Sequence, residues 1–332
     1  MIEQFNPFYC RLIDRSFIPL FGKIFISFLI GAFFLIPRLL FKNSYKSMIE
    51  DKSIILVLII VVAFMSLYYA TYVLKSLLRQ MYNLMESEKA NVFFQYYMRI
   101  LRDKNFIFCG ILFAVINTFI GIFLGVEAPY GSLLYITFLW GFFLAGFICG
   151  MGVLGIYAVL KLIHNYTKSE HLNLDFRAPD NAGGLQFIGN AILKFSLVII
   201  LTGILIAGYI LFAPWSHGGL LQSLVKNSWI LFPFIMAITI TFSPIHDLSK
   251  VLIAFKNEKE AELSLAIKEL EKKQTKESFT KIQEKIEQRK IVFKMKTIPL
   301  SKGSNSLLLL GNIASLLPGG LKIYDFVIKY IE

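Results

Sequence analysis

The sequence predicts an all-α integral membrane protein with about six transmembrane helices, a cytoplasmic helical hairpin and an interfacial C-terminal helix. Of 332 residues, 56% are hydrophobic and only 17% are charged, whereas about a quarter of the residues in a soluble domain are charged. Several apolar runs approach or exceed the roughly 20 residues that a helix needs to cross a bilayer. Beyond Pro244 the chain becomes charged and keeps a helical periodicity. The lipid bilayer is therefore the first partner that the sequence implies.

Six apolar segments are the predicted spans of a transmembrane domain that covers residues 1–245. Residues 54–74 are the clearest, because these 21 residues contain no charge. The first segment ends in Leu-Ile-Pro-Arg instead of a small-residue cleavage site, so we interpret it as a retained span and not as a signal peptide. The predicted spans are residues 17–41, 54–74, 107–126, 133–160, 195–213 and 229–245.

The distribution of lysine and arginine predicts the orientation of these spans. With the N-terminus inside, the two inner connections hold six and three basic residues, and the chain after residue 245 holds sixteen. The outer loops hold four, none and one. Because basic residues concentrate on the cytoplasmic side, we expect a multi-pass protein of the plasma (inner) membrane with both termini in the cytoplasm.

Polar and small residues within the spans are candidates for a pore or gate. Asn117 lies near the middle of the third span, where an amide either lines an aqueous path or bonds to a neighbouring helix. Gly146 and Gly150 have the four-residue spacing that lets two helices approach closely. Tight helix packing and the lining of a narrow pore are both compatible with this spacing.

Ser243 and Pro244 separate the last span from the charged segment. Serine is a favoured N-cap and proline a favoured first residue of a helix. The pair therefore predicts that a helix restarts near the membrane surface, so that the span and the following arm are joined rigidly or through one hinge. A hinge at this point would act as a gate.

Residues 246–304 are predicted to form the cytoplasmic helical hairpin. Leu263, Ile267 and Leu270 follow a helical spacing, which resumes after a polar break at Phe279, Ile282 and Ile286. Each stripe is too narrow for a large core, which predicts self-association into a homo-oligomer. Residues 305–332 contain an apolar run too short to span a bilayer and then an amphipathic segment, so we expect an interfacial or subunit-packing tail.

Basic residues one turn apart mark the second arm of this hairpin as a candidate ligand site. Lys281, Lys285 and Arg289 recur at four-residue intervals. Such a face binds a phosphate-rich ligand, for example a nucleotide or oligonucleotide, or else it is a solvated face beside an anionic membrane.

The loop between the fourth and fifth spans is the most distinctive polar stretch, and three interpretations fit it. Arg177 and the backbone N–H groups at Gly183 and Gly184 would cradle an anion. Oxygen atoms of Asp175, Asp180 and Asn181 are weak candidates for a hard cation, since their spacing is not that of an EF-hand. The third interpretation is a rigid, hydrogen-bonded turn that fixes the helix beginning at Leu185.

One segment of this loop carries a resemblance to other proteins. The string Pro-Asp-x-x-Gly-Gly-Leu, from Pro179 to Leu185, resembles a segment of uncharacterised prokaryotic multi-pass membrane proteins. The resemblance covers about a dozen residues and implies no activity.

These observations favour a homo-oligomeric channel-like protein, gated by an anionic cytoplasmic ligand that acts on the hairpin. A non-conducting receptor or scaffold that signals through the cytoplasmic helices is the first alternative. A membrane-bound metalloenzyme that uses the loop at residues 164–184 is the second. Because no familiar catalytic or nucleotide-binding motif is present, we expect a protein that is not an enzyme. The sequence points to no cofactor and to no particular protein partner.

Overall fold

The computed structural model describes residues 6–14, 20–33, 53–85, 87–126, 130–169, 172, 174–213, 215–216, 218–272 and 276–301. The regular elements in these residues are all helices, which confirms the predicted all-α class. The predicted tail at residues 305–332 lies outside the described residues, as does much of the first predicted span. Only the helix α2 (Leu20–Ala32) represents that span.

Among the described residues, five helical segments are long and apolar enough to cross a membrane. They contain the helices α5 (Ser53–Asn83), α7 (Asp103–Leu124), α8 (Leu133–Thr167), α9 (Gln186–Phe212) and α10 (Leu220–Glu271). Each includes most or all of one predicted span, so membrane character is confirmed. Several helices extend well beyond the apolar run, because a helix continues wherever its polar residues can remain in water.

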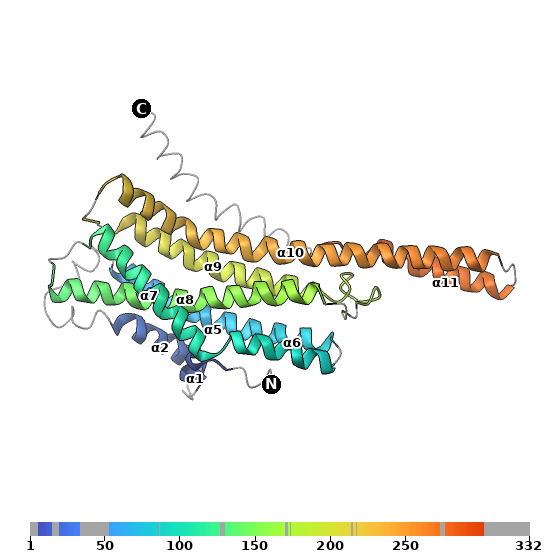
Figure 1. The fold of residues 1–332 in the computed structure, drawn as a ribbon, viewed down its shortest axis with the longest axis horizontal. Coiled ribbons are helices and arrows are strands. Elements are labelled where there is room, and N and C mark those ends of the chain that lie inside the picture. The colour runs from blue at the N-terminus through green and yellow to red at the C-terminus, as the bar shows by residue number, and fades with distance from the viewer. Residues whose placement is uncertain are drawn as a thin grey trace, which may run out of the picture.

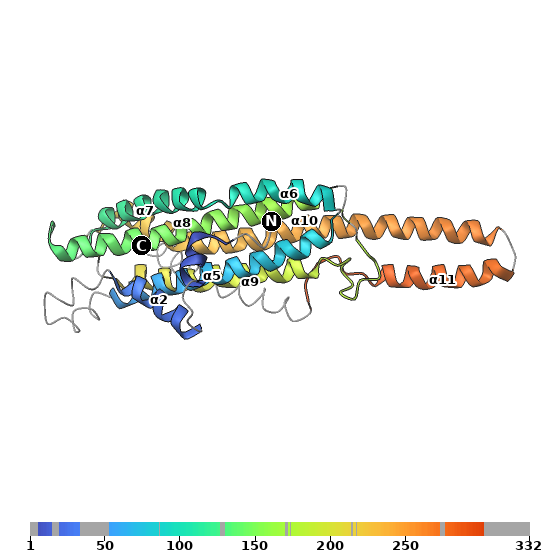
Figure 2. The same ribbon diagram turned by 90° about the horizontal axis from the view of Figure 1, so that it is seen from below.

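The five helices pack side by side in a bundle (Figure 1). The helix α7 lies along α8, and α9 packs against both α5 and α10. Around them, α2 packs on α5, the short α1 (Phe8–Asp14) contacts α5, and α6 (Ser87–Ile100) touches α5 and α8. Beyond the bundle, α10 continues into a long projection, and α11 (Lys276–Phe293) folds back beside it (Figures 1 and 2). We call the projecting part of α10, from residue 253 onward, together with α11 the arm.

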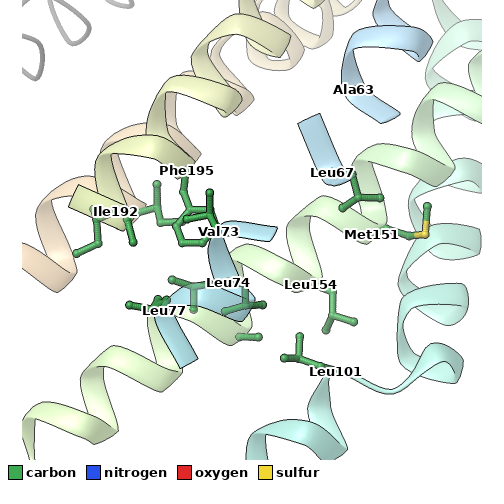
Figure 3. Close-up of a cluster of buried hydrophobic side chains, with 14 of the residues drawn as sticks. Ala63, Leu67, Val73, Leu74, Leu77, Leu101, Met151, Leu154, Ile192 and Phe195 are labelled. Carbon is green, nitrogen blue, oxygen red and sulfur yellow. The ribbon is translucent and has the colours of Figure 1, made fainter. Parts of the chain in front are cut away.

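The main core lies where α5, α8 and α9 meet (Figure 3). This cluster includes Leu67 and Leu77 of α5, Met151 of α8, and Ile192 and Phe195 of α9. All five side chains are buried. Because lipid tails are as apolar as these side chains, close packing, and not exclusion of water, holds the helices together in the spanning region.

The helix α10 corrects the prediction made at Ser243 and Pro244. It runs through both residues as one helix of 52 residues, so Ser243 is not an N-cap and Pro244 is not the first residue of a new helix. Pro244 is buried, and Ile240 and Leu248, one turn to either side of it, are fully buried too. A proline inside a helix removes one hydrogen bond, but unwinding here would also break up this packed face. Tertiary packing therefore overrides the local capping preference.

The same helix shows where the arm leaves the bundle. Leu248 and Leu252 belong to the main core, although both follow the predicted domain boundary at residue 245. The next buried residue of α10, Leu263, belongs to a separate small cluster with Val292 and Met295. The arm therefore departs after Leu252, about two turns beyond Pro244.

Candidate functional site

The bundle contains an apolar, partly open cavity of about 200 Å³ between α5, α7, α8, α9 and α10. For comparison, an engineered apolar cavity of about 150 Å³ in another protein binds benzene. The lining residues include Leu56, Ala63 and Leu74 of α5, Phe106 and Leu124 of α7, Phe142, Gly152 and Val159 of α8, Phe195 and Ile210 of α9, and Trp229, Phe232, Met236 and Ile240 of α10. None of the described residues that line it is charged.

The cavity is long and narrow. Its lining on α8 extends from Phe142 to Val159, a separation of about 26 Å at ~1.5 Å per residue. The lining of α5 covers a similar length, from Leu56 to Leu74. This length is comparable to the hydrocarbon core of a bilayer, which is about 30 Å thick. A lining of this length matches an extended chain better than a compact ring system.

Two glycines of α8 leave room on the cavity side. A β-carbon added to Gly152 or Gly155 would meet no other atom within 4 Å, and both residues line the cavity. Gly146 and Gly150 behave differently. A β-carbon at Gly146 would lie 2.8 Å from Ala114 Cα of α7, and one at Gly150 would overlap the carbonyl oxygen of Cys109. The structure thus supports tight packing at Gly146 and Gly150, although Gly146 also borders the cavity.

Polar groups in the cavity wall have partners in neighbouring or adjacent backbone. The amide of Asn117 donates to Phe142 O at 2.7 Å and so links α7 to α8. This is the bond to a neighbouring helix that was one of the two interpretations of Asn117. The hydroxyl of Thr202 donates to Val198 O at 3.0 Å, within its own helix. Because burying an unpaired charge or polar group is costly, this wall is suited to an apolar ligand and not to a permeating ion.

Aromatic side chains line one end of the cavity. Trp215 packs against Phe142 and Tyr209, with ring centroids 6.1 and 6.0 Å apart, and its indole N–H donates to Ile210 O at 2.9 Å. Trp229 stacks on Phe232 at 5.7 Å. Tryptophan with an apolar body and a satisfied N–H is typical of the membrane interface. This end of the cavity therefore lies near one surface of the bilayer.

The loop before α9 is a hydrogen-bonded turn organised by Asp180. One carboxylate oxygen accepts from the backbone N–H groups of Ala182 and Gly184, at 2.9 and 3.1 Å. The other accepts from Gln186 N at 3.0 Å, at the start of α9. Asn181, Gly183 and Gly184 all have positive φ, which curls the chain around this carboxylate. The predicted anion cradle is thus occupied by an anion of the protein itself.

The remaining residues of the proposed anion and cation sites do not gather around a ligand. Asp175 accepts from Arg177 N at 2.8 Å, which caps the same turn, and the Arg177 guanidinium lies over the ring of Phe176. His164 lies 2.8 Å from Asp247 and joins the end of α8 to α10. Within the described part of the chain, no three metal-ligating side chains come together.

This loop also fixes the base of the arm. Lys296 N, just after α11, donates to Asn181 O at 2.7 Å. A β-carbon at Gly189, in the first turn of α9, would overlap the carbonyl oxygen of Pro299. Phe176 packs on the small arm cluster around Leu263. The arm is therefore attached at three places: through α10, through the loop and through the segment that follows α11.

The basic residues of α11 do not form one free cluster. Lys281 and Arg289 are exposed, whereas Lys285 is half-buried and its ammonium donates to Gln288 Oε1 at 3.2 Å. Their role as a ligand site stays a prediction.

Sequence reasoning did not identify the cavity. It singled out Gly146 and Gly150 of α8, which pack against α7. Gly152 and Gly155 carried a usable signal, because they lie on a different side of the helix from that pair. Comparison with known protein families, curated proteins and solved structures returns no match for this chain.

Proposed function

We propose that the protein is a membrane receptor that takes an apolar, chain-like ligand from the bilayer into the cavity and transmits its occupancy to the arm. The observation that carries this proposal is the course of α10. Five of its residues line the cavity: Trp229, Phe232, Pro233, Met236 and Ile240. The same uninterrupted helix then extends to Glu271 at the far end of the arm.

The chemistry of the cavity defines the ligand class as the acyl chain of a lipid or a fatty acid. The wall is apolar, and its length matches an extended hydrocarbon chain. Such a chain would lie parallel to the lipid chains of the surrounding bilayer. The aromatic end provides the transition to the membrane interface, where a headgroup or carboxylate would remain hydrated. Filling the space restores dispersion contacts that an empty cavity lacks.

The coupling between cavity and arm follows from packing. At Gly203, a β-carbon would lie 3.0 Å from Pro233 Cβ, so α9 and α10 are close beside the cavity. Gly189, near the start of α9, touches the segment after α11. A ligand that separates α9 from α10 would therefore move two of the three attachments of the arm, the one through α10 and the one through the segment after α11. It shifts the arm only by the difference in its affinity for the two arrangements.

The test uses quenching of tryptophan fluorescence by 9,10-dibromostearate in purified protein. The background is Trp140→Phe, which leaves Trp215 and Trp229 beside the cavity. Gly152→Phe places a ring in the cavity and should weaken the quenching constant about fivefold or more, a loss of about 1 kcal/mol of binding. Gly208→Phe is the matched control, because Gly208 also has open space around it but does not line the cavity. Equal quenching in both variants would refute the proposed site.

A homo-oligomeric channel is the second candidate function. It is favoured by the exposed apolar side chains of α11, which leave a surface for a neighbouring copy. A pore would then lie between subunits, with an anionic ligand acting at Lys281, Lys285 and Arg289. Ion flux from protein-loaded liposomes distinguishes the candidates: a conductance that is lost on neutralising these three residues supports the channel, and no conductance supports the receptor.

The membrane topology proposed for either function has α2 as a sixth span and both termini in the cytoplasm of a prokaryotic cell. The support is the excess of basic residues in the inner connections. Cysteines introduced at Ser169 and Ser216 test it in intact cells. A membrane-impermeant maleimide should label position 216 and not position 169, and the reverse pattern would overturn the orientation.

A further inference from the structure

The arm buries only one side of each of its two helices. On α10, Leu263 and Ile267 face α11 and are 5% and 9% exposed. On α11, Gln288 and Val292 face back and are 8% and 0% exposed. Lys256 of α10 also donates to Phe293 O at 2.7 Å, which fixes the register of the two helices. Each helix therefore has an outward side that the other does not cover.

The outward side of α11 carries an apolar stripe. Phe279, Ile286 and Phe293 are 64%, 39% and 74% exposed. They are spaced seven residues apart, so they form a nearly straight row of about 21 Å along one side of the helix. Phe279 and Ile286 belong to the predicted apolar stripe of this helix, and α10 leaves both of them uncovered. Exposed aromatic rings outside the apolar bundle indicate a partner.

The outward side of α10 differs in shape and in charge. Ala254, Ala261 and Leu265 lie opposite the buried Leu263 on the helix, and Leu265 is 62% exposed. The alanine side chains on this side of α10 are small, whereas the side chains of the α11 stripe are large. Three exposed glutamates border it: Glu258, Glu262 and Glu269.

The two helices of the arm have opposite charge. Residues 257–271 of α10 contain five glutamates and two lysines, a net charge of −3. The helix α11, residues 276–293, contains five basic residues and three glutamates, a net charge of +2. Arg289 and Lys290 both border the apolar stripe and are exposed. Contact between two copies of α11, or between two copies of α10, would thus bring like charges together, whereas α11 against α10 pairs opposite charges.

We propose that the arms of neighbouring copies pack head to tail, with the α11 stripe of one copy on the outward side of α10 of the next. The rows that meet are Phe279, Ile286 and Phe293 on one copy, and Ala254, Ala261 and Leu265 on the other. Because each copy offers one surface of each kind, the contact is heterologous and repeats, and it closes into a ring when the rotation between copies allows it. This contact is independent of the ligand proposed for the cavity.

Disulfide cross-linking tests the pairing in the full-length protein. Two differently tagged chains are co-expressed on a background in which Cys10, Cys109 and Cys149 are replaced by alanine or serine. One carries Leu265→Cys and the other Ile286→Cys. Mild oxidation should join the two tags, while neither variant expressed alone should cross-link. Ile291→Cys is the matched control, because Ile291 is 39% exposed, as Ile286 is, but lies on another side of α11.

Charge reversal adds a second measurement on the same cross-link. Glu258→Lys with Glu269→Lys on the first chain should lower the yield roughly tenfold, since like charges across an interface are costly. Arg289→Glu with Lys290→Glu on the second chain should restore it. Cross-linking of Ile286→Cys with itself would instead show a two-fold α11 contact, and the absence of any cross-link would show that these faces do not meet. Either result overturns the proposal.

Discussion

Two sides of α8 pack in opposite ways, although both are built around a pair of glycines. On the side of Gly146 and Gly150, α7 approaches so closely that a β-carbon would collide with its backbone. On the side of Gly152 and Gly155, a β-carbon would meet nothing within 4 Å. The comparison shows that the same type of residue either lets two helices approach closely or leaves open space beside its helix. The outcome depends on whether a neighbouring helix packs directly against the glycine.

The largest effect is expected at the close contact. Gly150→Ala should lower the free energy of unfolding by about 2–3 kcal/mol, because the new methyl group forces α7 and α8 apart. The measurement is the midpoint of thermal unfolding in detergent, followed by size-exclusion chromatography of heated samples. An unchanged midpoint would mean that the two helices are not in close contact at this position.

A smaller loss is expected where the same interface is held by a side chain. Asn117→Leu removes the 2.7 Å bond to Phe142 O and should cost about 1 kcal/mol, since interhelical hydrogen bonds in membrane proteins contribute about 0.6 and at most ~1.7 kcal/mol. Thr118→Val is the control, because that hydroxyl donates only to Ala114 O of its own helix. If both variants lower the unfolding midpoint equally, the Asn117 bond does not stabilise the interface.

On the cavity side, the sign of the effect should reverse. Gly152→Ala and Gly155→Ala each add a methyl group where space is open. Alanine is favoured over glycine inside a helix by about 0.5–1 kcal/mol, so both variants should unfold at a higher temperature than the wild type. A lower midpoint in either variant would show that the cavity side is as closely packed as the α7 side.

The smallest effect is expected at Thr202→Val, in the cavity wall. Its hydroxyl lies 3.5 Å from Ser66 Oγ of α5, too long to stabilise the fold appreciably, and otherwise bonds within α9. Valine has nearly the same shape, so stability should change by less than about 0.5 kcal/mol. A larger loss would indicate that polar bonding across the cavity contributes to the bundle.

The spanning helices could be predicted closely because hydropathy is a local property of the chain. The segment at residues 54–74 needed only its own composition to be identified, and it lies within α5. Helix ends were less predictable. The sequence at Ser243 and Pro244 favours a new helix start, yet burial of Ile240, Pro244 and Leu248 maintains one continuous helix. That burial depends on helices elsewhere in the chain.

For the loop before α9, the sequence predicted a turn but not the hydrogen bonds that hold it. The pattern of Asp180, Gly183 and Gly184 indicated turn chemistry, and the turn is present with positive φ at both glycines. The pattern did not show that the Asp180 carboxylate would accept three backbone hydrogen bonds and so occupy the predicted anion cradle. The residue types in this loop are compatible with a cradle that is open to an external anion and with one that the Asp180 carboxylate occupies. Only the path of the backbone distinguishes the two.

The sequence by itself determined the membrane class, the positions of the long helices and the change to a charged arm, because each depends on the transfer of short segments between water and lipid. Only the tertiary structure decided which glycines are contacts and which face a cavity. Gly150 and Gly152 are the same type of residue and lie on the same helix, but two residues turn the chain by about 200°. Their surroundings are therefore set by different neighbours, α7 for the first and the cavity for the second.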